Sequence, residues 1–147
     1  MCSSPNIKTV SSVAAATSPP IDERGRSVLI ADDHEDTRLM LKTILEMNRF
    51  YVLEAADGEE AVVLTERERP DLVLMDFSLP ILDGLTALRL IRANKTTCNV
   101  PIIFLSGRAE PAPQKAVREA GCDDYLIKPI DLDQMVQLIE RRIAVNA

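Results

Sequence analysis

Five residues that can do acid, hydroxyl or amine chemistry stand directly after short apolar runs of this sequence. They are Asp32, Asp33, Asp76, Ser106 and Lys128. If the apolar runs are strands of one parallel sheet, the carboxyl ends of the strands lie on one edge, and these side chains converge there. Taken singly, each residue is better explained as a helix cap, a turn residue or a surface amine. Three acids, one hydroxyl and one amine on the same edge are not explained by separate accidents, so we interpret them as a functional cluster.

The chemistry of such a cluster follows from its charges. Two carboxylates about 4 Å apart repel by about 4 kcal/mol at an effective dielectric constant of about 20, so three acids together require cations. Mg²⁺ suits them because it is a hard ion that takes one or two carboxylates with water and phosphate oxygens. We predict that Asp76 attacks a phosphoryl group as the nucleophile, that Lys128 and the metal offset its charge, and that Ser106 donates a hydrogen bond to it.

The segments that must position these residues alternate between strand-like and helix-like patterns. The predicted strands are 28–31, 51–55, 72–75, 101–105 and 125–127. The predicted helices are 36–47, 59–67, 84–93, 114–120 and 132–145. This alternation predicts an α/β fold, in which a five-stranded parallel sheet carries helices on both faces. The continuous apolar strands are typical of a sheet that is buried on both sides.

Local signals add detail to the predicted helices. In the first helix, Met40 is expected in the buried stripe and Arg38 is expected to face water. Gly84, in the first turn of the third helix, indicates close packing or an unusual backbone angle. Asp131 has the position of an N-cap for the last helix.

Composition limits the class of protein. The 147 residues suffice for one domain, which we place at 26–147, and the Ser, Ala, Thr and Pro content of 1–25 predicts a disordered tail. The net charge of −6 without a basic block argues against direct binding of nucleic acid. No stretch is long and apolar enough for a signal peptide or a membrane span, so we expect a cytoplasmic protein.

The cysteines and the histidine carry no separate chemistry in this interpretation. Cys2, Cys98 and Cys122 are odd in number and widely spaced, which predicts reduced thiols. His34, the single histidine, excludes a metal site built on histidine. It adjoins the acidic pair and is expected to be an exposed loop residue.

In their order along the chain, these motifs resemble those of response-regulator receiver domains, in particular the stand-alone chemotaxis regulator. The matching segments are Ile30-Ala31-Asp32-Asp33, the run from Pro70 to Asp76 with Pro80 and Asp83-Gly84 after it, Leu105-Ser106-Gly107, and Tyr125-Leu126-Ile127-Lys128-Pro129. The resemblance covers roughly 26–145. It implies the flavodoxin-like strand order 2-1-3-4-5.

The resemblance also implies a role for each matching residue. Asp76 is the phosphoacceptor and Asp33 a direct Mg²⁺ ligand, assisted by Asp32, often through water, and by the backbone carbonyl of Ser78. Lys128 bridges Asp76 and the phosphoryl group, and its bond to Pro129 is expected to be cis. Ser106 and Tyr125 form a switch pair, in which the hydroxyl moves towards the phosphate and the ring follows it inward. Ile130 departs from the family, where many relatives have Phe.

The function implied is that of a single-domain response regulator in a two-component phosphorelay, not of an enzyme with a separate substrate. A sensor histidine kinase or a histidine phosphotransfer protein would donate the phosphoryl group, and the signal would leave by protein contact or onward phosphotransfer to an unknown downstream protein. One alternative is a phosphatase with an aspartyl nucleophile, although Ser78 stands where such enzymes usually have a second acid. Another is a receiver-like binding module that works without phosphorylation. A flavin carrier is disfavoured because the loop after the first strand is acidic.

Overall fold

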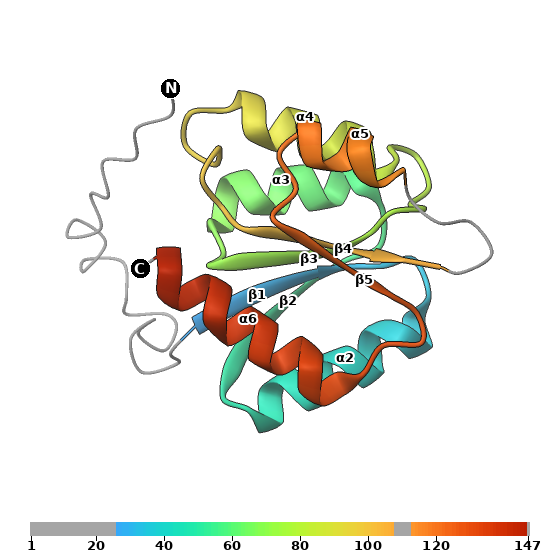
Figure 1. Ribbon diagram of the computed structural model, residues 1–147, viewed down its shortest axis with the longest axis vertical. Coiled ribbons are helices and arrows are strands. Elements are labelled where there is room, and N and C mark those ends of the chain that lie inside the picture. The colour runs from blue at the N-terminus through green and yellow to red at the C-terminus, as the bar shows by residue number, and fades with distance from the viewer. Residues whose placement is uncertain (1–25, 108–112, 147) are drawn as a thin grey trace.

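Strands and helices alternate along the chain of the computed structural model, which describes residues 26–107 and 113–146 (Figure 1). The strands are β1 Arg26–Ala31, β2 Phe50–Ala55, β3 Leu72–Asp76, β4 Ile102–Ser106 and β5 Asp124–Ile127. The helices are α2 Glu35–Met47, α3 Gly58–Glu68, α4 Gly84–Ala93, α5 Gln114–Glu119 and α6 Leu132–Asn146. The predicted tail, 1–25, lies outside the described residues.

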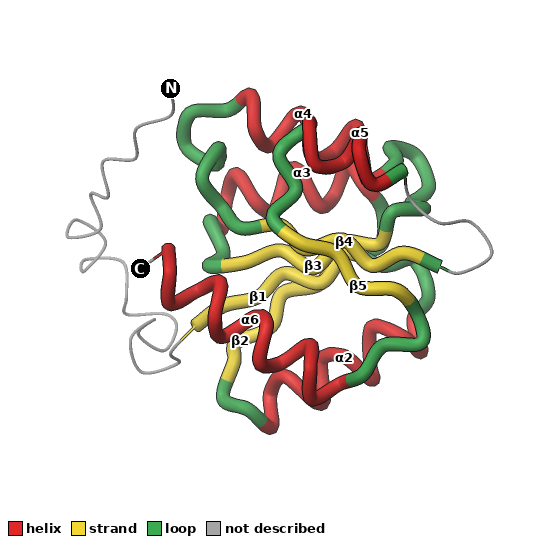
Figure 2. Tube along the Cα trace, in the orientation of Figure 1, coloured by secondary structure: helices red, strands yellow, loops and turns green. Residues whose placement is uncertain are grey.

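All five strands are parallel and lie in the order β2-β1-β3-β4-β5, which confirms the predicted fold class and strand order. Helices α2 and α6 cover one face of the sheet, and α3, α4 and α5 cover the other (Figure 2). Each strand-to-helix-to-strand unit therefore returns to the same edge of the sheet, and the loops that follow the strands meet there.

The apolar strands are continuous because both of their faces are buried. In β3, Leu72 and Leu74 join the core under α2 and α6, whereas Val73 and Met75 join the core under α3, α4 and α5. A slip of one residue would exchange the two sets of side chains, so the two cores fix the register of the central strands.

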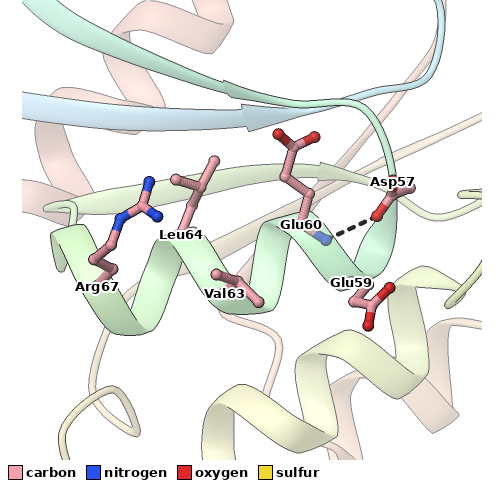
Figure 3. Close-up of a pocket in the computed structure, with 6 residues that line it drawn as sticks. All are labelled: Asp57, Glu59, Glu60, Val63, Leu64 and Arg67. Atoms are coloured by element: carbon pink, nitrogen blue, oxygen red, sulfur yellow. Dashed lines mark hydrogen bonds between the residues drawn. The ribbon is translucent and has the colours of Figure 1, made fainter.

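Aspartate side chains cap the N-termini of three helices. Asp57 accepts a hydrogen bond from the backbone N–H of Glu60 at the start of α3 (Figure 3), and Asp83 accepts one from that of Thr86 at the start of α4. Asp131 accepts one from the N–H of Gln134, which confirms it as the N-cap of α6. Each cap satisfies a backbone donor that the first helical turn leaves free.

Helix α2 differs from its predicted pattern. Met40 is 45% exposed, and Arg38 is turned inward with its side chain only 16% exposed. The helical period alone could not show that Arg38 has partners at the sheet edge, which are described below.

Cys122 is a free thiol, as predicted, and burial raises its pKa. Within 26–107 and 113–146, no helix is long and apolar enough to cross a membrane.

Candidate functional site

The register of the central strands brings the predicted residues to one edge of the sheet. Ala31 of β1 pairs with Met75 of β3, so Asp32 and Asp76, which follow these two residues, lie side by side. On the other side of β3, Ser106 ends β4 opposite Ile127 of β5. Lys128 follows Ile127 and reaches back across the edge to the acids. The sheet therefore gathers a carboxylate pair, a buried hydroxyl and an amine from four strands.

Asp76 is the most constrained of the acids. Its residue is 4% exposed, one carboxylate oxygen accepts the N–H of Ser78 at 3.1 Å, and the other lies 3.2 Å from the Nζ of Lys128. Burial raises the pKa of Asp76 above its ordinary value, and the charge of Asp32 adds to this increase. The N–H of Ser78 and the ammonium of Lys128 oppose the increase without cancelling it. The site therefore holds a desolvated carboxylate beside a cation.

Asp32 is fully buried and only half satisfied. Its Oδ1 accepts the backbone N–H of His34 at 2.8 Å, but its Oδ2 makes no hydrogen bond. The Nζ of Lys128 lies 3.7 Å from Oδ2, which is close enough for electrostatic attraction only. A buried carboxylate oxygen without a hydrogen bond is costly. Its position beside two further carboxylates fits a bound cation.

Four residues offer ligand atoms that all lie within 4.8 Å of one another: Asp32, Asp33, His34 and Asp76. Three of these are oxygen donors, the kind that Mg²⁺ prefers. The fourth is the ring of His34, whose Nδ1 lies 3.2 Å from Asp32 Oδ1 and 3.1 Å from Asp33 Oδ1. His34 is exposed, as predicted, but the sequence did not predict that its ring contacts both acids.

Ser106, Tyr125 and Ser78 complete the predicted set. Ser106 is buried at the end of β4, where its hydroxyl lies 3.5 Å from the carbonyl oxygen of Gly107. Tyr125 lies on β5 opposite Phe104 and packs against the core under α3, α4 and α5. Ser78 contacts Asp76 through its backbone N–H. The bond between Lys128 and Pro129 is cis, as the resemblance implied.

The loop after Asp76 is held by close packing against two glycines. A Cβ at Gly84 would lie 2.8 Å from the backbone oxygen of Asp76. A Cβ at Gly58, at the start of α3, would clash with the backbone oxygen of Leu82. Only glycine allows these approaches. The start of α3 therefore helps to position the segment that carries Ser78, and the prediction of close packing at Gly84 is confirmed.

Arg38 is a site residue that sequence reasoning missed. Its Nη1 donates to the backbone oxygen of Asp32 at 2.7 Å, and its Nε pairs with Glu54 of β2 at 3.2 Å. It therefore ties the turn after β1 to the neighbouring strand. The partner acid lies in a different strand, so no local spacing could have indicated the contact.

A surface pocket on α3 takes no part in this cluster (Figure 3). Its lining consists of Asp57, Glu59, Glu60, Val63, Leu64 and Arg67. All of these residues belong to one helix and its N-cap, and none of them carries a predicted role.

Known proteins resemble the chain over most of its length. The family model described as response regulator receiver domain matches residues 28–140. The transcriptional regulatory protein PrrA of Mycobacterium tuberculosis is 36% identical over 77% of this chain and 48% of its own length. The alkaline phosphatase synthesis transcriptional regulatory protein PhoP of Bacillus subtilis is 34% identical over 83% of this chain and 51% of its own length. The chain thus spans about half the length of these curated relatives.

A solved structure is similar in both sequence and shape. It is the receiver domain of the sensor histidine kinase PA1611 from Pseudomonas aeruginosa, which has a magnesium ion coordinated in its active-site cleft. That domain is 35% identical to this chain, with a TM-score of 0.76, over 82% of this chain and 98% of its own.

Proposed function

Because this chain belongs to the response-regulator receiver family of two-component systems, we propose that Asp76 accepts a phosphoryl group from a sensor histidine kinase or a histidine phosphotransfer protein. The observation that supports this most is the placement of Asp76. It is a buried carboxylate that Lys128 contacts at 3.2 Å, beside Asp32, whose Oδ2 has no hydrogen bond. A cation and a transferring phosphate would complete the interactions that these groups lack.

In the proposed transfer, a carboxylate oxygen of Asp76 forms the new bond to phosphorus while the bond between phosphorus and the donor imidazole nitrogen breaks. The imidazole leaves with the electron pair and takes up a proton. The ammonium of Lys128, already on one oxygen of Asp76, is placed to pair with an oxygen of the transferred group. The buried hydroxyl of Ser106 is the proposed hydrogen-bond donor to another oxygen of the phosphoryl group.

Asp33, Asp76 and the backbone carbonyl of Ser78 are the groups that we propose to hold Mg²⁺, with Asp32 assisting through water. Bound Mg²⁺ would offset the negative charge on the phosphoryl group during transfer. The cluster within 4.8 Å supports the assignment of the carboxylates. The magnesium ion in the related kinase receiver domain supports the choice of metal.

The signal is proposed to pass through Ser106 and Tyr125 to the surface formed by α5, β5 and α6. To move a two-state equilibrium from mostly off to mostly on, phosphorylation must stabilise the active state by roughly 5 kcal/mol more than the inactive state. We propose that charge-assisted hydrogen bonds from Lys128 and Ser106 to the phosphoryl dianion supply this difference. We propose that this receiver domain acts in the cytoplasm, by contact with a downstream protein or by onward phosphotransfer, and not by turning over a separate substrate.

Phosphorylation by a small donor tests the proposal. The protein is incubated with Mg²⁺ and acetyl phosphate, and its intact mass is followed together with those of Asp76→Asn and Asp133→Asn. Asp133 is an exposed acid in the first turn of α6 that is not one of the four clustered ligand residues, and it serves as the matched control. We expect the wild type and Asp133→Asn to gain one phosphoryl group and Asp76→Asn to gain none.

Three other results would contradict the proposal. Equal phosphorylation of Asp76→Asn would show that another residue is the acceptor, and no gain by the wild type would favour a binding module that works without phosphate. Steady release of phosphate from many small phosphate esters would instead indicate a phosphatase.

A further inference from the structure

His34 occupies a helix N-cap but does not cap its helix. It precedes α2, and its side chain makes no capping hydrogen bond. Ser, Thr, Asp and Asn are the residues that usually fill this position, because their side chains accept a backbone N–H of the first turn. The ring of His34 is instead turned back towards the acids after β1, although the side chain is 68% exposed.

The spacing of the ring and the acids is that of neighbouring ligands on one metal ion. In an octahedral site with bonds of about 2.1 Å, adjacent ligand atoms lie about 3 Å apart. Nδ1 of His34 lies 3.2 Å from Asp32 Oδ1 and 3.1 Å from Asp33 Oδ1. The distance to Asp33, a proposed direct ligand, is therefore that of an adjacent ligand atom, whereas the distance to Asp32 is that of a hydrogen bond.

A second observation at the site indicates a cation. Asp32 is fully buried, and its Oδ2 makes no hydrogen bond. The Nζ of Lys128 lies 3.2 Å from the carboxylate of Asp76 but 3.7 Å from that of Asp32. The acids therefore carry more negative charge than Lys128 offsets.

We propose that His34 supplies a ring nitrogen to the divalent cation held by Asp33 and Asp76, and that this site therefore favours Ni²⁺ over Mg²⁺ more strongly than an all-oxygen site does. Imidazole nitrogen suits Ni²⁺, whereas Mg²⁺ prefers oxygen. The ligand set is then mixed, with nitrogen from the start of α2 and oxygens from the ends of β1 and β3. The inference rests on the proposed metal site and extends it to the choice of metal.

The single histidine of the chain makes the test specific. Untagged protein is labelled with ¹⁵N only in histidine and loaded with Mn²⁺, and the nitrogen coupling to the metal is measured by pulsed electron paramagnetic resonance. A coupling that changes with the label arises from His34 alone. In parallel, Ni²⁺ and Mg²⁺ affinities are measured by calorimetry for the wild type, His34→Asn and Asp33→Asn.

We expect a label-sensitive nitrogen coupling in the wild type and none in His34→Asn. The ratio of Ni²⁺ to Mg²⁺ affinity should fall by about tenfold or more in His34→Asn, because losing even an outer partner of a metal ligand costs about 10–100-fold. Asn keeps the backbone N–H that Asp32 accepts, so the turn itself is retained.

Two outcomes would overturn the inference, and they differ in what else they imply. If Mn²⁺ binds and Asp33→Asn abolishes binding, but no histidine coupling is seen and His34→Asn keeps the affinity ratio, the ring is not a ligand and the proposed Mg²⁺ site stands. If the wild type binds neither ion, or Asp33→Asn binds both as well as the wild type does, the proposed metal site fails and the inference fails with it.

Discussion

Replacing Asp76 with Asn should stabilise the protein in the absence of metal. At an effective dielectric constant of about 20, the 3.2 Å contact with Lys128 attracts the Asp76 charge by about 5 kcal/mol. Asp32 offers an oxygen within 4.8 Å, where the repulsion is at least about 3.5 kcal/mol, and the more exposed Asp33 adds a screened contribution. The attraction and the repulsion therefore nearly cancel, so the cost of burying the carboxylate decides whether the substitution stabilises or destabilises the protein.

We expect Asp76→Asn to raise the free energy of unfolding by about 1–3 kcal/mol at pH 7 in EDTA, which is the range found for burying a polar group without full compensation. The pKa of Asp76 is raised in the folded state, so that state holds its proton to higher pH than the unfolded chain does. Wild-type stability therefore falls as the pH rises from the pKa of Asp76 in the unfolded chain to its higher pKa in the folded state. The gain in the variant should shrink as the pH is lowered from 8 to 4.

Urea unfolding in EDTA at several pH values measures this gain, and Asp71→Asn is the matched control. Asp71 lies outside the cluster, and its carboxylate accepts the backbone N–H of Ser27 at 2.8 Å and the hydroxyl of Ser27 at 3.2 Å. The same change should therefore destabilise the protein there, by about 1–2 kcal/mol. A wild type more stable than Asp76→Asn at pH 7, or a gain that does not vary with pH, would refute the reasoning.

Three further substitutions test the surroundings of the site. Gly58→Ala should cost about 1–3 kcal/mol of stability, because its Cβ would meet the backbone oxygen of Leu82; a thermal melt measures this, and an unchanged melting temperature would contradict it. Arg38→Met should lower stability by about 1 kcal/mol and weaken Mg²⁺ binding, since the turn after β1 loses its tie to Glu54; calorimetry that gives wild-type affinity would contradict it. Lys128→Met should tighten Mg²⁺ binding but slow phosphorylation by acetyl phosphate, because the amine competes with the cation for Asp76 and also pairs with the phosphoryl group; faster phosphorylation would contradict it.

The sequence was sufficient to predict the fold because each strand is signalled by its own apolar run. The runs of β3 and β4 are continuous, which indicates burial on both faces, and the residues after them are placed by the geometry of any parallel sheet. Asp76, Ser106 and Lys128 could therefore be assigned to one edge before their distances were known. The strand order needed the family resemblance, since apolar runs do not state which strands are neighbours.

Contacts made by long or rotatable side chains were not predictable in the same way. The period of α2 placed Arg38 towards water, but its guanidinium reaches Asp32 and Glu54 across the turn. His34 was correctly expected to be exposed, yet an exposed ring can still touch two acids. Both contacts depend on side-chain torsions and on partners from other segments, which hydrophobic patterns do not encode.

The two cores explain why the acids stay together despite their repulsion. Asp32 and Asp76 follow paired residues of β1 and β3, and a shift of either strand would move its apolar side chains to the wrong face. The carboxylates therefore cannot separate without unpacking the sheet, and their repulsion remains in the folded state. Binding of a cation relieves this repulsion only in the folded protein, so a metal at 100 times its dissociation constant should add about 2.7 kcal/mol to stability. The same constraint ties the charge state of Asp76 to the packing of β4 and β5, because Lys128 and Ser106 stand on those strands' ends.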